Sequence, residues 1–247
     1  MITAGIDLSS KPSKTASCVI DWSARGATVI ELIQGVDDDA ILALASNTDK
    51  VGIDAPFGWP TSFVNAVGQN SIDGSWPADY SHADNKSYRL RRTDLWVWSV
   101  GVSPPLSVST DRIAIPAMRV SGLLSRLPNP TARDGSGVVV EVYPAVALHR
   151  WGFPSRGYKR AENARARQSL VTRFFEETTS WLSVRDIDVE QCSTSDDAFD
   201  SLIAALVARA AAQNLVDQIP EDNRNDAARE GWIAVPVDGS LKELSVG

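Results

Sequence analysis

The sequence predicts an α/β fold in which one mixed sheet of five strands carries helices on both faces. Two observations lead to this prediction. Three strand-like runs come first, and helical and strand-like stretches alternate after them. The fourth and fifth strand-like runs each follow helical stretches and stop at a proline, which cannot continue the hydrogen bonding of a strand. A chain of 247 residues is long enough to form a single domain with a large core.

The first three runs predict one half of the sheet. Residues 2–8 combine β-compatible side chains with one glycine and the carboxylate of Asp7. Residues 15–22 and 27–33 follow, separated by a short turn at Arg25-Gly26. The short turn predicts an antiparallel hairpin, and we expect the first run to pair with the second.

The next segment predicts a helix, a fourth strand and an insertion. Three aspartates at residues 37–39 favour the start of a helix, because carboxylates stabilise its positive end. Residues 50–55 then form a strand that ends at Pro56, and the helical connection predicts that it runs parallel to the first strand. Residues 57–130 are irregular and rich in proline, and we interpret them as a helical insertion that covers one end of the sheet. Helices are expected there at residues 61–67, 86–100 and 116–127.

The last part of the chain predicts the fifth strand and two long helices. Residues 138–143 form the strand, which Pro144 ends. Three elements follow: a basic helix at residues 159–181, a helix with an apolar stripe at residues 195–214, and a short strand at residues 231–236. This order of elements is that of an RNase H-like domain, with the first strand central and the fourth and fifth strands parallel beside it.

Composition excludes several classes of protein. No apolar run reaches the roughly 18 to 20 residues of a membrane span, and no signal peptide is evident, so we expect a cytoplasmic protein without a membrane partner. Cys18 and Cys192 are too few for a disulfide framework and lack the spacing of metal ligands. A net charge of −7 argues against a protein that coats nucleic acid indiscriminately, although it leaves room for a local basic groove.

Four aspartates are candidates for a metal site. Asp7 and Asp54 lie near the ends of two strands that are predicted to be parallel neighbours, and Asp197 and Asp200 share one face of the last long helix. Clustered carboxylates repel one another unless cations neutralise them, and hard oxygen ligands select Mg²⁺ or Mn²⁺. Two such ions would suit hydrolysis of a phosphodiester. The alternative is structural, because any helix start carries aspartates and Asp54 could accept hydrogen bonds within its turn.

Glu141 interrupts the apolar run of the fifth strand and is a fifth candidate for the site. Its carboxylate could bind metal or act as an acid near the substrate. It could equally pair with an arginine, and Arg91, Arg92 and Arg133 are available. The sequence leaves these alternatives open.

The chain resembles a known family through six short motifs in a fixed order: Gly5-Ile6-Asp7, Ile53-Asp54-Ala55-Pro56, Arg92-Thr93-Asp94, Glu141-Val142-Tyr143-Pro144, Asp197-Ala198-Phe199-Asp200-Ser201-Leu202 and Glu230-Gly231-Trp232-Ile233. The family is domain-of-unknown-function family 429, described as predicted RNase H-like nucleases, and the resemblance covers nearly the whole chain.

The resemblance implies roles for particular residues. The aspartate pattern also looks like that of RuvC-type Holliday-junction resolvases, in which such positions bind the catalytic metals; Asp54 stands where those enzymes usually carry the longer glutamate. Arg91, Arg92, Asp94 and Tyr143 belong to or adjoin the family motifs and are the expected substrate-binding residues.

Basic and aromatic residues suggest contacts with nucleic acid. Seven basic residues against one acid lie between Arg150 and Arg173, and a second basic cluster lies between Lys86 and Arg92. These clusters could contact phosphates, although most charged runs are solvated helix faces. Trp59 and Trp76 are the tryptophans expected in loops near the site; such aromatic loops would also suit a homodimer. His82 and His149 lack ligand spacing and are expected to be structural.

Three functions compete on this basis. The first is a Mg²⁺- or Mn²⁺-dependent nuclease in which Asp7, Asp54, Asp197 and Asp200 hold the metal. The second is a catalytically silent binding or scaffold protein with the same fold. The third is an actin-like, ATP-dependent phosphotransferase; this class needs two such domains and glycine-rich phosphate turns, whereas one domain uses the whole length of the chain.

Overall fold

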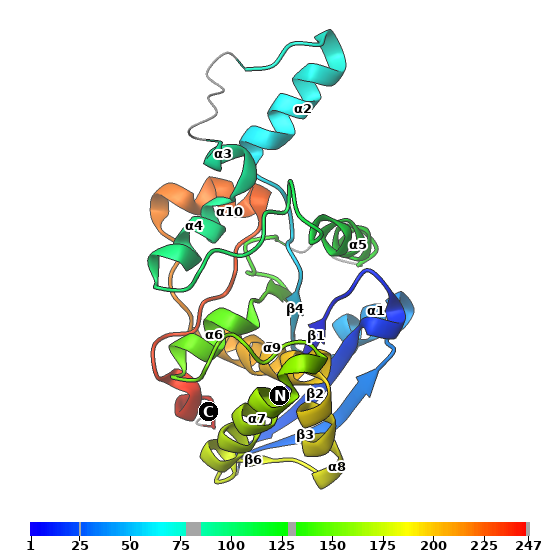
Figure 1. Cartoon of the computed structure of the whole chain (residues 1–247), viewed down its shortest axis with the longest axis vertical. Helices are drawn as coiled ribbons and strands as arrows, with labels where there is room; N and C mark the ends of the chain where they lie inside the picture. The colour runs from blue at the N-terminus through cyan, green and yellow to red at the C-terminus, as the bar shows by residue number, and fades with distance from the viewer. Residues whose placement is uncertain (25, 78–84, 128–131, 246–247) are drawn as a thin grey trace.

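The computed structural model describes residues 1–24, 26–77, 85–127 and 132–245. Within these ranges, one mixed sheet of six strands has the order β5-β4-β1-β2-β3-β6 (Figure 1). The strands are β1 (Ile2–Asp7), β2 (Ala16–Ser23), β3 (Gly26–Gln34), β4 (Lys50–Asp54), β5 (Val139–Glu141) and β6 (Leu182–Ser183). β1 is antiparallel to β2 and parallel to β4, and β4 is parallel to β5. The expected arrangement, a central first strand with the fourth and fifth strands parallel on one side of it, is confirmed.

The predicted number and ends of the strands need two corrections. A sixth strand, β6, pairs with β3 at the edge of the sheet, and its two residues are too few to leave a pattern in the sequence. Residues 231–236 do not form the predicted strand. They make two isolated bridges, from Ile233 to Glu141 and from Pro236 to Val216. Because the two bridges have different partners, no continuous strand pairing forms.

Helices surround this sheet and join its strands. Their bounds are α1 (Asp38–Asn47), α2 (Thr61–Asp73), α3 (Lys86–Arg89), α4 (Arg92–Ser99), α5 (Ala114–Ser125), α6 (Pro144–Arg150), α7 (Ala164–Thr178), α8 (Asp186–Thr194), α9 (Asp196–Ala212) and α10 (Arg224–Glu230). The helix predicted at residues 86–100 is broken, since Leu90 and Arg91 have extended backbones between α3 and α4. The basic helix predicted from residue 159 begins at Ala164, after a short 3-10 turn. Among the described helices, none has both the length and the apolar character needed to cross a bilayer.

The two faces of the sheet bury separate apolar cores. On one face, Cys18, Ile20 and Trp22 of β2 pack with α6, α7 and α9. On the other, alternate residues of β1 and β4 pack with Ile41 of α1 and with α5. This alternation follows from the pleat, which sends successive side chains to opposite faces. The expected helices on both faces are confirmed.

Two glycines let α9 lie directly on the sheet. A β-carbon on Gly5 of β1 would lie 2.1 Å from the backbone of Ala205, and one on Gly52 of β4 would lie 2.4 Å from the carbonyl oxygen of Ala204. Any larger residue would therefore push the helix away. Each glycine stands two positions before an aspartate, Asp7 or Asp54, so those carboxylates leave the sheet on the face that α9 covers.

Three helices of the insertion, together with α10, form the part of the molecule beyond the end of the sheet. Figure 1 places α2, α3, α4 and α10 there, with α4 and α2 both contacting α10. The expected insertion of residues 57–130 therefore shares this region with a helix from the C-terminal part of the chain.

Candidate functional site

Three carboxylates converge at the ends of the central parallel strands. Asp7 ends β1, Asp54 ends β4, and the parallel register places the two residues directly side by side. Asp200 comes from the second turn of α9, whose close packing on Gly5 and Gly52 brings its carboxylate to the same point. One carboxylate oxygen from each aspartate lies within 4.8 Å of the others. We call Asp7, Asp54 and Asp200 the triad.

Asp197, the fourth predicted ligand, lies one turn earlier on α9 and beside the triad. Its half-buried carboxylate lies close enough to Asp7 for the two charges to interact, and burial, followed by the charge of Asp196, raises the pKa of Asp197. Ser195 caps α9 by accepting a hydrogen bond from the N–H of Ala198, so Asp197 is left to face the site. The structure thus brings all four predicted aspartates together, three as a compact group and one through Asp7.

Burial and mutual repulsion raise the pKa values of Asp7 and Asp54. Burial is the largest cause for Asp7, and the charges of Asp54 and Asp200 add to it, so that the pKa lies well above its usual range. Burial also raises the pKa of Asp54 to about 7; the ammonium of Lys159 opposes this shift, and the charge of Asp200 adds to it. Without a further cation, part of this cluster therefore holds protons at neutral pH.

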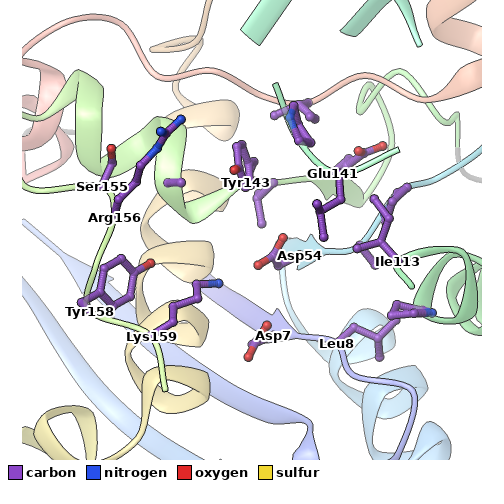
Figure 2. A pocket seen from close by; sticks show the side chains of 18 of the residues that line it. Asp7, Leu8, Asp54, Ile113, Glu141, Tyr143, Ser155, Arg156, Tyr158 and Lys159 are labelled. Carbon is purple, nitrogen blue, oxygen red and sulfur yellow. The ribbon is translucent and has the colours of Figure 1, made fainter. Parts of the chain in front are cut away.

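Lys159 is the cation that the chain itself supplies to the triad. Its Nζ lies 2.5 Å from Asp200 Oδ2, and Tyr158 Oη donates a hydrogen bond to Asp200 Oδ1 at 2.7 Å. Burial would lower the pKa of Lys159, but the negative charges of Asp200 and its neighbours outweigh burial and hold the pKa well above its usual value. Figure 2 shows the Lys159 side chain directed towards Asp7 and Asp54. One ammonium group, that of Lys159, is therefore in direct contact with the triad.

A strained loop carries Lys159. The next residue, Arg160, has φ 73° and ψ 162°, a conformation that costs a residue other than glycine about 1–3 kcal/mol. Arg167, which is buried on α7, donates hydrogen bonds to the carbonyl oxygens of Tyr158 and Arg160 at 3.0 and 3.1 Å. The same guanidinium reaches the carbonyl oxygens of Ser193 and Thr194, just before α9. Arg167 thus fixes the Lys159 loop to the helix that carries Asp200.

Sequence reasoning missed Lys159 and Tyr158 as members of the site. Both lay in the basic segment for which a solvated helix was the ordinary explanation. The one available signal was the unopposed charge of that segment, together with Gly157, which precedes the pair and has φ 75°.

Glu141 lies in a buried ion-pair network next to the triad. Its carboxylate accepts two hydrogen bonds from the Arg91 guanidinium, at 2.7 and 2.9 Å, and one from the N–H of Phe57 at 2.9 Å. Arg91 also pairs with Asp94 at 2.8 Å, and none of these three charged side chains is more than 2% exposed. Gly231 makes room for the network, since a β-carbon there would lie 2.7 Å from Glu141 Oε2. Of the interpretations left open for Glu141, the structure shows the arginine pair.

The same network joins the insertion to the C-terminal part of the chain. Glu230 accepts hydrogen bonds from the N–H groups of Thr61 and Arg92, at 2.7 and 2.8 Å. The Arg92 side chain points elsewhere and pairs with Asp226 at 3.1 Å. Arg133 donates to the carbonyl oxygen of Arg229. The ion pairs and hydrogen bonds of these charged residues therefore hold the region beyond the sheet together.

A cavity of about 550 Å³ opens over the triad. Asp7, Asp54, Tyr143 and Lys159 line it, and Figure 2 shows them converging from β1, β4, the residue before α6 and the strained loop. Burial, followed by the charge of Asp54, raises the pKa of Tyr143, which keeps its hydroxyl protonated. The cavity combines a floor of carboxylates with basic side chains in its wall, Arg156, Lys159 and Arg160, which suits a ligand that carries both an anionic group and a bound metal.

The model of a family described as a protein of unknown function (DUF429) matches residues 5–225. The chain belongs to the DUF429 family. The match includes the triad, Asp197, Glu141 and the loop of Lys159, and it confirms the family resemblance. No curated protein and no solved structure matches this DUF429 chain.

The remaining predicted residues of the DUF429 protein lie at varied distances from the site. Among the four expected substrate-binding residues, Arg91 and Tyr143 line the cavity, whereas Asp94 is buried and Arg92 lies at a second hollow with Asp226; their role in substrate binding stays a prediction. In the described part of the chain, neither Trp59 nor Trp76 lines the cavity. His149 is exposed at the end of α6, and His82 lies outside the described residues.

Proposed function

We propose that this DUF429 protein is a divalent-metal-dependent phosphodiesterase that hydrolyses nucleic acid, built on an RNase H-like fold. One observation carries the proposal: carboxylate oxygens of Asp7, Asp54 and Asp200, from β1, β4 and α9, lie within 4.8 Å of one another. The strand order supports the fold, because β5-β4-β1-β2-β3 is the order expected of an RNase H-like sheet and β6 is an addition at its edge.

The triad suits Mg²⁺ or Mn²⁺. All its ligands are hard carboxylate oxygens, which these ions prefer. Three carboxylates, with Asp197 beside them, have one ammonium group, that of Lys159, in direct contact, so their negative charge is not fully compensated. The raised pKa values of Asp7 and Asp54 have the same origin, and a divalent cation would displace the protons that they hold.

The chain's own residues would orient the reaction. Tyr158 fixes the Asp200 carboxylate through its hydroxyl, and Lys159 is placed to donate to a phosphate oxygen above the triad. Asp197 lies beside Asp7 and adds a fourth carboxylate to the site. A bound divalent ion would polarise the phosphodiester and lower the pKa of an attacking water.

One alternative function has a specific observation in its favour. Lys159 already neutralises Asp200, so a catalytically silent protein could keep the cluster stable without any metal. This alternative predicts no tight divalent site and no cleavage.

Calorimetric titration of Mn²⁺ and Mg²⁺ separates the two functions. The proposed phosphodiesterase binds Mn²⁺ with micromolar affinity, and Asp7→Asn loses that binding. Asp21→Asn is the matched control, because Asp21 is an exposed carboxylate on the neighbouring strand β2 and pairs in register with Ile2, at the opposite end of β1 from Asp7. Absence of binding to the wild type would favour the silent alternative.

Cleavage of labelled single-stranded DNA and RNA then tests the activity itself. With Mn²⁺ present, we expect Asp7→Asn and Asp200→Asn each to lower the rate by a factor of about 100 or more, since each removes a group that stabilises the transition state. Asp21→Asn should cleave like the wild type. Full activity in both triad variants would refute the proposed function.

A further inference from the structure

The cavity over the triad has two walls of opposite chemistry. One wall is polar and basic and comes from the strained loop and the turn after it: Ser155, Arg156, Lys159, Arg160 and Asn163. The other is apolar and comes from the end of β1, the segment before α5 and the start of α5: Leu8, Pro105, Leu106, Ile113 and Pro116. Figure 2 shows Arg156 and Lys159 on one side of Asp7 and Asp54, and Leu8 and Ile113 on the other.

The apolar wall continues to the open surface. Leu106, which lines the cavity together with Ile113 and Pro116, is 58% exposed. Exposed apolar side chains that gather beside a charged site are typical of a surface that contacts a ligand. The ligand must therefore carry an apolar, flat or bulky part together with its anionic part.

We infer that the cavity takes one unpaired nucleotide of a single strand, with its phosphate at the triad and Lys159 and its base against Leu106 and Ile113. This inference rests on the proposed function, because the triad defines where the phosphate lies. The basic wall matches the phosphate and the apolar wall matches the faces of a base. Tyr143, which is half-buried and lines the same cavity, adds an aromatic ring for contact with the sugar or base.

The size of the cavity favours a single nucleotide over a base pair. About 550 Å³ lies within the range of clefts that enclose one small ligand. Inside a duplex, each base is paired and stacked, so it must leave the helix before it can reach the apolar wall, which costs free energy. The substrates preferred by this site are therefore single-stranded ends and short oligonucleotides.

Calorimetry with two probes tests the inference: thymidine 5′-monophosphate and inorganic phosphate, each titrated with and without saturating Mn²⁺. We expect the nucleotide to bind at least about tenfold more tightly than phosphate when Mn²⁺ is present. Leu106→Ser should reduce nucleotide affinity to nearly that of phosphate and leave phosphate affinity unchanged. Ile115→Ser is the matched control, since it removes an equally exposed apolar side chain that does not line the cavity, and it should change neither affinity.

The outcomes distinguish this inference from the proposed function. If Mn²⁺ binds but the nucleotide and phosphate bind equally, the single-nucleotide site is refuted and the metal site stands. If Mn²⁺ does not bind but the nucleotide still binds more tightly than phosphate, and Leu106→Ser removes that preference, the nucleotide site stands without the phosphodiesterase. Equal rates of cleavage of a duplex and of its separate strands would also overturn the inference, because we expect the single strands to be cleaved at least about tenfold faster.

Discussion

Replacing Gly5 by alanine tests whether the close approach of α9 to the sheet assembles the site. The new β-carbon would lie 2.1 Å from the backbone nitrogen of Ala205 and from the carbonyl oxygen of Ser201. Ordinary contact needs roughly 3.5 Å or more, and backbone atoms cannot turn aside as a flexible side chain can. The helix must therefore move away by more than an ångström, and Asp200 moves with it.

The expected loss of folding stability in Gly5→Ala follows from this geometry. Overpacking a core costs about 1–3 kcal/mol, and we expect the upper end of that range or more, because both contacts are to backbone. With a typical urea dependence of about 1–3 kcal/mol per molar, the unfolding midpoint should fall by about 1–2 M. The displaced Asp200 should also weaken Mn²⁺ binding by a factor of about 10 or more.

Urea unfolding followed by circular dichroism measures the first effect, and calorimetry measures the second. Gly68→Ala is the matched control, because Gly68 lies inside α2 and a β-carbon there would meet no atom within 4 Å. Alanine should stabilise that helix by about 0.5–1 kcal/mol. If Gly5→Ala unfolds at the midpoint of the wild type and binds Mn²⁺ equally well, the proposed role of the close packing is wrong.

Three further changes have defined outcomes. Asp54 has a pKa of about 7 in the metal-free folded protein and a lower pKa in the unfolded chain, so the folded state binds more protons between these two values. The free energy of unfolding, measured by urea titration in EDTA at several pH values, should therefore fall as the pH rises from about 4 to 7. Asp54→Asn should make this dependence on pH weaker. Arg91→Met leaves the two buried carboxylates of Asp94 and Glu141 without their cation and should lower the free energy of unfolding in urea by about 3–5 kcal/mol. The control Arg126→Met breaks an exposed ion pair and should lower it by less than about 1 kcal/mol. Equal losses in the two variants would contradict the role of the buried network. Lys159→Met removes the ammonium group that pairs with Asp200, so Mn²⁺ should bind about tenfold more tightly in calorimetry. An unchanged affinity would show that Lys159 does not compensate the negative charge of the triad.

The arrangement of the central strands could be predicted because it follows from short-range rules. A hairpin turn fixed the pairing of the second and third strands, and the helical connection required the strand containing Asp54 to run parallel to the first. Since parallel neighbours end at the same edge, the convergence of Asp7 and Asp54 followed directly. The spacing of Asp197 and Asp200 placed both on one face of α9, which was also correct.

The loop of Lys159 could not be predicted, because tertiary contacts override its local preference. Its sequence favours a helix, yet Arg160 takes a left-handed φ that the buried guanidinium of Arg167 and the carboxylate of Asp196 hold in place. The hydrogen bonds from Arg167 to the carbonyl oxygens of the loop cannot be predicted from the local sequence. The same holds for β6, which exists because Leu182 reaches the free edge of β3.

The buried network shows a second limit. The sequence offered three arginines as partners of Glu141, and the choice of Arg91 depends on a fold in which Gly231 leaves room for both side chains. A charge that looks catalytic in a motif can therefore be structural, and only its neighbours in space distinguish the two.

An anomalous difference map from crystals soaked in Mn²⁺ tests the central claim most directly, because it locates the ion without assuming any activity. We expect one or two peaks within bonding distance of carboxylate oxygens of Asp7, Asp54 and Asp200, with Lys159 moved away from Asp200. A map without a peak at the triad at saturating Mn²⁺, with Lys159 still paired with Asp200, would contradict this claim.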